Sequence, residues 1–457
     1  MATSLIAAFE RVRRGDVELA GLLPAAQVQA ACATAEYQDR GIVYTAATTL
    51  YAFLAQMLRA DRSCQQTVAG VAAHRVANGQ RPCAADTGGY CKARQRIPES
   101  VCRTLFEQAG RETEDRLTEQ GLWCGRRVRI IDGSTLQIAD TAANRREYPL
   151  QRGLQPGCHY PVVRILAVFS YAAGVVLQAL LRPYQGKGTG ETGMLRDLAD
   201  FFLPGDVQLN DRYFGGYWDI AFWQQRQVDL VTRLPASRQS DFRRGRRLGK
   251  DDHLVTWQRT GRPEWLTLAE AAHFPETLTL REVRVPVRIP GFRTREVIVL
   301  TTLLDPVAFP AHELARLYRR RWQAELNLRS LKTHMEMDYL RTKHPETVRK
   351  EFFIHLLAYN LVRRVALEAA LSNHLEPWQI SFKGTLQTLH EFLARFHRAS
   401  IVTQWVESWL QTIAQIQVGH RPDRMEPYAV KRRPKDYPPL RENRASYKYR
   451  RRFQQKR

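Results

Sequence analysis

Tyr318, Arg321, Glu325 and Lys332 lie in the stretch 310–337, which has no glycine or proline in its interior. The stretch is rich in leucine, alanine, arginine and glutamate, so it predicts one long helix. At the helical repeat the four side chains fall within an arc of roughly 60°. A single carboxylate would then share a helix face with two cations and a phenol. Such a face could bind a metal ion beside phosphate groups, or it could be a solvated face on which Glu325 pairs with neighbouring arginines.

Two aspartates could complete a set of carboxylates with Glu325. The β-branched run RVRIIDGST contains Asp132, and the short apolar run VQLND ends in Asp211. We predict both aspartates at or just past the ends of strands, where ligand sites form in open α/β sheets. Three carboxylates are natural oxygen ligands for Mg²⁺, which keeps some of its waters and also takes phosphate oxygens. From spacing alone, the two aspartates could also be ordinary turn residues.

The composition predicts a polyanionic partner. Lys and Arg number 69 against 46 Asp and Glu, and the net charge of the 457-residue chain is +23. By its field such a chain attracts an anion, and nucleic acid is the obvious candidate. Two Mg²⁺ ions about 3.5–4 Å apart would support an in-line phosphoryl displacement on it. The cations beside Glu325 would hold the phosphates in register.

Other features predict a cytoplasmic protein without a membrane span. The seven cysteines are odd in number and form no Cys-x-x-Cys pair, which indicates reduced thiols. The N-terminus has too short an apolar run for a signal peptide. The apolar stretch 165–181 is short for a bilayer span, and we interpret it as a buried β-hairpin.

The periodicity changes along the chain and predicts an α/β protein with several parts. Within 123–234 the order is three strands, helix, strand, helix, strand, which indicates a mixed sheet with helices on its faces. The basic link DTGGYCKARQRIP is interpreted as a loop between helices. The predicted parts are a helical N-terminal DNA-binding domain (1–122), the first part of the catalytic core (123–234), a β-rich insertion (235–304), the helix that carries Glu325 (305–345), a helical C-terminal region (346–420) and a basic tail (421–457).

The motifs together resemble a known family. Tyr318, Arg321, Glu325 and Lys332 match the Tyr-x-x-Arg-x-x-x-Glu-x-x-x-x-x-x-Lys (YREK) signature of one group of bacterial insertion-sequence transposases of the DDE class. Flanking motifs are similar in order and spacing over roughly residues 85–435. They are Asp132-Gly133-Ser134, Asp211-Arg212-Tyr213-Phe214-Gly215, GTGETGMLRDL, YCKARQRIP and LLAYNLVR.

This resemblance implies a fold and a chemistry. It implies an RNase H-like mixed sheet interrupted by a β-strand insertion, together with a helical domain that recognises terminal inverted repeats. The catalytic and metal-binding residues would be Asp132, Asp211 and Glu325, with two Mg²⁺ ions for which Mn²⁺ substitutes. The residues that contact DNA phosphates would be Tyr318, Arg321 and Lys332.

The resemblance also implies a reaction order and an assembly. Water attacks the phosphodiester at the end of the element, and the freed 3′-OH then attacks a strand of target DNA. A homodimer would act on paired ends of double-stranded DNA, associated with the nucleoid and with no membrane. Relatives that flip a base carry a tryptophan where this chain has Val297 or Ile298, so excision through a hairpin is left open.

Two functions from different classes are consistent with these residues. The first is a cut-and-paste DNA transposase. The alternative is a non-catalytic DNA-binding derivative that represses transposition. An intact set of carboxylates favours the enzyme, and Asp132, Asp211 and Glu325 are all present.

Overall fold

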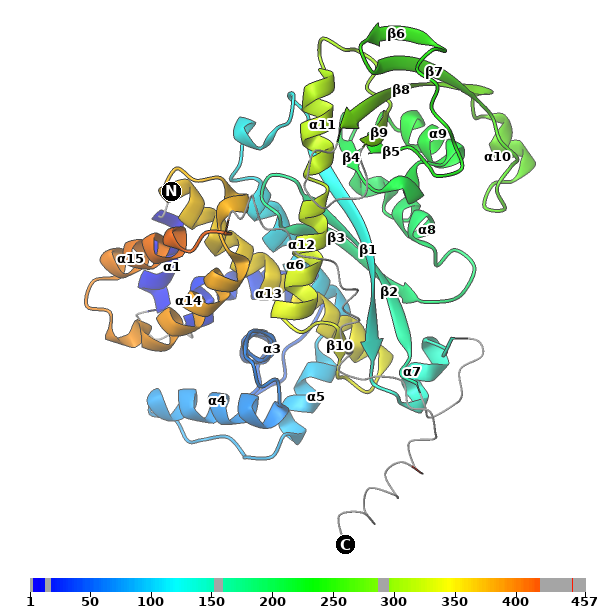
Figure 1. Ribbon diagram of the computed structural model, residues 1–457. Coiled ribbons are helices and arrows are strands. Elements are labelled where there is room, and N and C mark those ends of the chain that lie inside the picture. The colour runs from blue at the N-terminus through cyan, green and yellow to red at the C-terminus, as the bar shows by residue number, and fades with distance from the viewer. Residues whose placement is uncertain (1–2, 13–17, 152–158, 287–295, 420–445, 447–457) are drawn as a thin grey trace, which may run out of the picture. The chain divides into compact units, whose positions relative to one another are not determined.

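The computed structural model describes residues 3–12, 18–151, 159–286, 296–419 and 446 (Figure 1). These residues form two compact units, each built from several segments. We call residues 1–117, 172–177 and 327–419 the helical unit, and residues 118–171 and 178–326 the sheet unit. The six-part division predicted from the sequence remains a prediction.

The helical unit is built around one long helix, α13 (Pro345–Ser372), of which most residues are buried. A helix that is apolar on most of its faces must be covered on all sides. Phe353 of α13 stacks on Phe106 of α6 with ring centroids 5.9 Å apart. The other elements of this unit are α1 (Thr3–Val12), α2 (Ala25–Thr34), α3 (Ala46–Leu58), α4 (Cys64–Ala77), α5 (Gly88–Arg96), α6 (Glu99–Glu114), β10 (Tyr339–Leu340), α14 (Phe382–Arg395) and α15 (Val402–Gln415).

One buried amide ties α13 to other segments of the helical unit. Asn360 is fully buried, and its Oδ1 accepts from the backbone N–H of Val176 at 2.8 Å. Its Nδ2 donates to the carbonyls of Val176 at 2.8 Å and Phe106 at 3.3 Å. Gly110 leaves room for this contact, because a Cβ there would lie 2.6 Å from the Val176 carbonyl oxygen. Asn360 belongs to the LLAYNLVR motif, so this part of the motif has a structural role.

The sheet unit contains a mixed sheet with the strand order β3-β2-β1-β4-β5-β9-β8-β7-β6 (Figure 1). Strand β4 is parallel to both of its neighbours, β1 and β5, and the other registered pairs are antiparallel. The strands are β1 (Val128–Ile138), β2 (Val162–Ser170), β3 (Val176–Pro183), β4 (Val207–Leu209), β5 (Asp229–Arg233), β6 (Arg246–Gly249), β7 (Asp252–Gln258), β8 (Thr277–Pro286) and β9 (Glu296–Thr301). The mixed α/β class predicted from the sequence is confirmed.

Helices complete the sheet unit. They are α7 (Ala142–Glu147), α8 (Glu191–Arg196), α9 (Tyr217–Gln225), α10 (Leu268–Ala272), α11 (Ala311–Arg319) and α12 (Trp322–Arg329), of which the last ends in the helical unit. One core cluster packs Ile131 of β1 against Met194 of α8 and Trp223 of α9. A second cluster packs α9 against β5, β8 and β9. The same helix therefore contacts the predicted core strands and the strands of the predicted insertion.

The long helix predicted over 310–337 is interrupted in the structure. It forms α11, then α12, and then a π-helical turn at Ser330–His334. Across the break the backbone bonds tighten to three-residue spacing, with Arg321 N–H donating to the Tyr318 carbonyl at 3.1 Å. Arg320 turns to Tyr171, where its Nη1 donates to the hydroxyl at 3.2 Å. Arg320 is the middle one of three consecutive arginines, Arg319 to Arg321, and this contact directs its side chain to Tyr171.

The prediction of a loop for DTGGYCKARQRIP is wrong, because this segment forms α5. Arg94 lies in the interior, with its guanidinium over the rings of Phe53 and Tyr90 and its Nη1 bonded to Gln56 Oε1 at 3.3 Å. Burial of this side chain therefore stabilises a helix that two glycines and a run of cations disfavour locally.

The structure also bears on four further predictions, which concern the N-terminal helices, the cysteines, a membrane span and the basic tail. The described part of residues 1–117 is helical, as predicted. The six described cysteines are free, and Cys158 lies outside the described residues. None of the helices that the structure describes has the length and apolarity needed to span a bilayer. The predicted basic tail lies almost wholly outside the described residues.

We predict that Asn360→Leu lowers the free energy of unfolding of the helical unit by about 3 kcal/mol, because two buried backbone groups of Val176 lose their partner. Urea unfolding monitored by circular dichroism measures this loss. Asn78→Leu, at the exposed end of α4, is the matched control and should cost less than about 1 kcal/mol. Equal losses in the two variants would show that Asn360 does not bridge these segments.

Candidate active site

Asp132 lies within β1 rather than at its tip, so the prediction of its place on the strand is wrong. Strand β1 runs on to Ile138 because it pairs with β2 along this whole length, with Asp132 opposite Ala167. Ile131 belongs to the core, and neighbouring side chains on a strand point to opposite faces. The Asp132 side chain therefore projects from the opposite face of the sheet, where it is half-buried. Its Oδ1 accepts a hydrogen bond from Gly133 N–H at 3.0 Å.

Asp211 follows β4 as predicted, and the sheet brings it close to Asp132. Ile130 of β1 pairs with Leu209 of the parallel strand β4, and each aspartate comes two residues after its member of this pair. Asp211 Oδ1 accepts from Tyr213 N–H at 2.8 Å and so begins the short helix Arg212–Phe214. Thr232 Oγ1 donates to the Asp211 carbonyl at 2.5 Å. The carboxyl end of β4 thus sets the level of the site along the sheet.

Glu325 comes to the site on α12, and a buried ion pair fixes the preceding helix. Arg281 of β8 is fully buried and binds Asp252 of β7 at 2.6 Å. Its Nη1 also donates to the Phe309 carbonyl at 2.7 Å, directly before α11 begins. Strands of the predicted insertion therefore hold the start of the helical segment that carries the signature residues.

The four charged groups of the site influence one another. The pKa of Asp132 is raised to about 6, chiefly by burial and to a smaller extent by the negative charges of Glu325 and Asp211. The Arg321 guanidinium and the Gly133 N–H act in the opposite direction on the pKa of Asp132. This mutual influence puts the three predicted carboxylates within electrostatic range of one another, with Arg321 as their counter-charge.

Arg321 connects the carboxylates to the phenol of the signature. Its Nη2 lies 2.6 Å from Glu325 Oε1, which is the i,i+4 pair expected of an ordinary charged helix. Arg321 also reaches Tyr318 by a side-chain hydrogen bond. Burial raises the pKa of Tyr318, so the phenol stays neutral near pH 7.

Lys332 lies in the helical unit rather than in the sheet unit. It occupies the π-helical turn after α12, and its Nζ lies 2.9 Å from Asp338 Oδ1. The structure therefore groups Asp132, Asp211, Glu325, Tyr318 and Arg321 within one unit, and it places the sixth predicted residue in the other.

Two charged residues of this region were missed by the sequence analysis. Arg233, at the end of β5, is half-buried and has no acidic partner among the described residues, and its charge acts on Tyr318. Glu191 begins α8, and the charge of Asp211 raises its pKa after the larger effect of burial. Glu191 stands in the motif GTGETGMLRDL, where the only available signal was a carboxylate next to a strand-to-helix turn.

The Glu191 carboxyl group occupies the space that glycine leaves at position 133. A Cβ on Gly133 would lie 2.3 Å from Glu191 Cδ and within 2.7 Å of both carboxyl oxygens. Arg164 of β2 is a nearby positive charge and donates to the Thr189 carbonyl at 3.1 Å. A fourth carboxylate therefore packs directly against the residue that follows Asp132.

The donor set suits a weakly held hard cation rather than a closed metal cage. Among the residues that the structure describes, no three His, Cys, Asp or Glu side chains are arranged to hold a metal ion. Magnesium needs only one or two carboxylates when waters and substrate phosphates supply its remaining oxygens. Half-buried carboxylates around Asp132 provide such ligands, so the residues fit a divalent ion that binds together with a phosphate.

Comparison with known proteins identifies the family. The model of the family "Transposase DDE domain" matches residues 123–361, which is more than half of the chain. The chain belongs to the DDE transposase family. Enzymes of this family cleave DNA and transfer strands, and their domains generally use divalent metal ions. The protein is therefore a DNA transposase.

Individual relatives agree with this family assignment. The transposase InsG for insertion sequence element IS4 of Escherichia coli strain K12 is 26% identical over 372 residues, which covers 79% of each chain. The transposase for insertion sequence element IS421 of Escherichia coli is 35% identical over 96 residues, 20% of this chain and 26% of that protein. A piggyBac transposase synaptic complex with hairpin DNA superposes with a TM-score of 0.41 and 12% identity over 82% of this chain and 77% of that chain, too distant to support an inference.

We predict that Asp132→Asn stabilises the metal-free transposase at neutral pH while abolishing DNA cleavage. The folded-state pKa of Asp132 is about 6 against an ordinary value of 3.8, so the folded state binds the proton more tightly. Stability is then lost as the pH rises from about 4 to about 6, and an amide avoids this loss. Urea unfolding in EDTA should show a gain on the order of 2 kcal/mol at neutral pH and none near pH 4. A variant less stable than the parent at neutral pH would contradict this.

A second prediction concerns Gly133 and Glu191. The Cβ of Gly133→Ala must displace the flexible Glu191 side chain, so we expect reduced DNA cleavage with a nearly unchanged unfolding free energy. Glu191→Gln should reduce cleavage as well, and the double variant should be no worse than the more affected single one, because both changes remove the same carboxylate. Gly261→Ala is the matched control, since a Cβ there meets no atom within 4 Å. Additive losses would mean that the two residues act independently.

Proposed function

We propose that the transposase cuts DNA at the ends of an insertion sequence and joins the freed ends to target DNA, with Asp132, Asp211 and Glu325 as its catalytic residues. The observation that carries this proposal is the strand register that brings Asp132 and Asp211 to one level of the sheet, with Glu325 close enough for its charge to act on Asp132. Carboxylates separated by up to 193 sequence positions, from 132 to 325, act on one group. A structural ion-pair network needs no such concentration of negative charge, whereas a cation-binding site does.

We infer that these carboxylates bind Mg²⁺, as two ions that Mn²⁺ can replace. Bound there, the ions would activate the attacking oxygen and stabilise the leaving oxygen of the phosphodiester. The chain itself brings the carboxylates together and keeps Arg321 beside them. The ion pair between Arg321 and Glu325 orients the Glu325 carboxylate before a metal ion binds. The desolvation that raises the pKa of Asp132 also favours binding of a cation in place of a proton.

The cations of the site would hold the DNA backbone. Tyr318 and Arg321 belong to the sheet unit with the carboxylates, and we propose that they and Lys332 contact phosphates near the cleaved end. Together with Glu325, these three residues support membership of the YREK subgroup. Arg233 has no acidic partner among the described residues and is a further candidate for a phosphate contact. Contacts of this kind fix the register of the strand and carry no sequence information.

The remaining features of the proposal follow from the family. We propose an RNase H-like core, for which the parallel β1-β4-β5 arrangement with Asp132 and Asp211 at one level is the supporting observation. The helical N-terminal domain (1–122) would bind terminal inverted repeats, and a homodimer would hold paired ends of double-stranded DNA at the nucleoid in the cytoplasm. The net charge of +23 supports a DNA partner.

A non-catalytic DNA-binding derivative is the second candidate. It would keep the basic surface but would have no need of the carboxylates. Asp132, Asp211, Glu325 and the Arg321 counter-charge are all retained, and together they favour the enzyme.

We predict that Asp211→Asn abolishes cleavage and strand transfer while leaving DNA binding within about twofold, because an amide is a poor ligand for a hard cation but keeps the size of the side chain. The measurement is a cleavage and joining assay on labelled DNA that carries the element's own ends, with Mg²⁺ or with EDTA. Binding is followed separately by gel shift at fixed salt.

The matched control for this assay is Asp200→Asn, which changes an exposed aspartate in the same unit. It should cleave like the parent. DNA binding without metal-dependent cutting by the parent would favour the derivative, and cutting by Asp211→Asn would remove this residue from the proposed catalytic set.

A further inference from the structure

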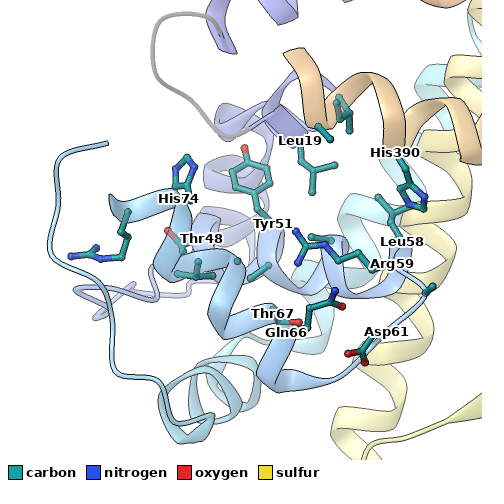
Figure 2. A pocket seen from close by; sticks show the side chains of 18 of the residues that line it. Leu19, Thr48, Tyr51, Leu58, Arg59, Asp61, Gln66, Thr67, His74 and His390 are labelled. Atoms are coloured by element: carbon teal, nitrogen blue, oxygen red, sulfur yellow. The ribbon is translucent and has the colours of Figure 1, made fainter. Parts of the chain in front are cut away.

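A cavity of about 660 Å³ lies within the helical unit, and none of the residues that line it belongs to the proposed catalytic set. Its walls come from α3, α4 and α14 (Figure 2). The apolar part of the lining includes Tyr51, Leu58 and Leu389, and polar side chains come from the α3–α4 connection and from α14. The cavity is large enough to hold a molecule the size of a nucleotide.

The cavity contains a guanidinium without an acidic partner. Arg59 is half-buried and extends into the pocket (Figure 2). Its side chain forms no hydrogen bond and no ion pair with any described residue. Gly70 faces it, and a Cβ there would lie 3.0 Å from Arg59 Nη1. A half-buried cation of this kind is normally paired, so the missing partner points to an anion supplied from outside.

The acid nearest in sequence does not neutralise Arg59. Asp61 also lines the cavity, but its Oδ1 accepts from Ser63 N–H at 2.8 Å and its Oδ2 from Ser63 Oγ at 3.1 Å. Asp61 thus stabilises the turn before α4, whose N-cap is Ser63. The charge of the cavity is left positive.

His390 of α14 also lines the cavity, but its Nε2 atom is buried and does not face it. Another ring atom bonds to the backbone of Leu58 and so holds the ring against α3. Arg59 is close enough for its charge to act on this ring, and its guanidinium is the group that a ligand in the cavity would meet.

We propose that this cavity binds a phosphate monoester, with Arg59 donating to the phosphate oxygens. A monoester has a second pKa of about 6, so near pH 7 it is mainly a dianion and offers more negative charge to Arg59 than a backbone diester does. The apolar wall formed by Tyr51, Leu58 and Leu389 would cover the rest of a nucleotide. The shared chemistry could come from a free mononucleotide or from the terminal phosphate of a DNA end.

The test uses isothermal titration of the full chain with inorganic phosphate and with deoxyadenosine 5′-monophosphate. Arg59→Gln should weaken binding of both by about tenfold or more, the effect of losing one charge-assisted hydrogen bond. Arg40→Gln, an exposed arginine of the same unit outside the cavity, removes the same charge and should bind like the parent.

A third arm separates the two sources of phosphate. Oligonucleotides with a 5′-phosphate and with a 5′-hydroxyl compete against the mononucleotide. Selective competition by the phosphorylated DNA supports the proposal with a DNA end as the source, and no competition by either supports it with a free nucleotide. Circular dichroism of each variant verifies folding. Binding that is equal in the parent, Arg59→Gln and Arg40→Gln, or no binding by the parent, would overturn the proposal, whatever the result of the cleavage assay.

Discussion

The sheet unit depends on the concentration of negative charge around Asp132. Burial is the largest cause of the raised pKa of this carboxyl group, and the charges of Glu325 and Asp211 add to it, so an ionised Asp132 is costly in this place. The cost is tolerated because Arg321 lies beside the carboxylates and because a rigid sheet holds Asp132 and Asp211 at one level. The positions of α11, α12 and the strands that anchor them have one common effect, which is to keep this unfavourable arrangement in place.

The sequence was sufficient to predict most elements of the sheet unit, because these depend on local patterns, whereas the catalytic set is implied by a family resemblance and stays a prediction. Strands β1 to β5 follow from β-branched runs, and Asp211 follows from the end of a short apolar run. The place of Asp132 was wrong for a non-local reason. Its strand continues because β2 pairs with it beyond the point at which β4 ends. A single sequence does not reveal which residues of two strands pair with each other.

Other features could not be predicted because they depend on tertiary contacts. Arg94 makes α5 a helix only through its burial against Phe53 and Tyr90. Arg320 binds Tyr171, which is 149 positions away, at the point where the predicted helix is interrupted. Glu191 becomes part of the site only because residue 133 has no side chain. In each case the deciding partner is far away in the sequence, so neither propensity nor periodicity could identify it.

Strand β9 gives the predicted insertion an unexpected evolutionary constraint. It pairs with β8 on one side and with core strand β5 on the other, so its residues protect what would otherwise be the open edge of the core. A descendant that lost the whole segment would expose β5 to pairing with other chains and would tend to aggregate. Lineages can therefore vary the outer strand β6, whereas β7 must keep the Asp252 partner of Arg281, and β9 must be inherited with the core or replaced by another strand that covers the same edge.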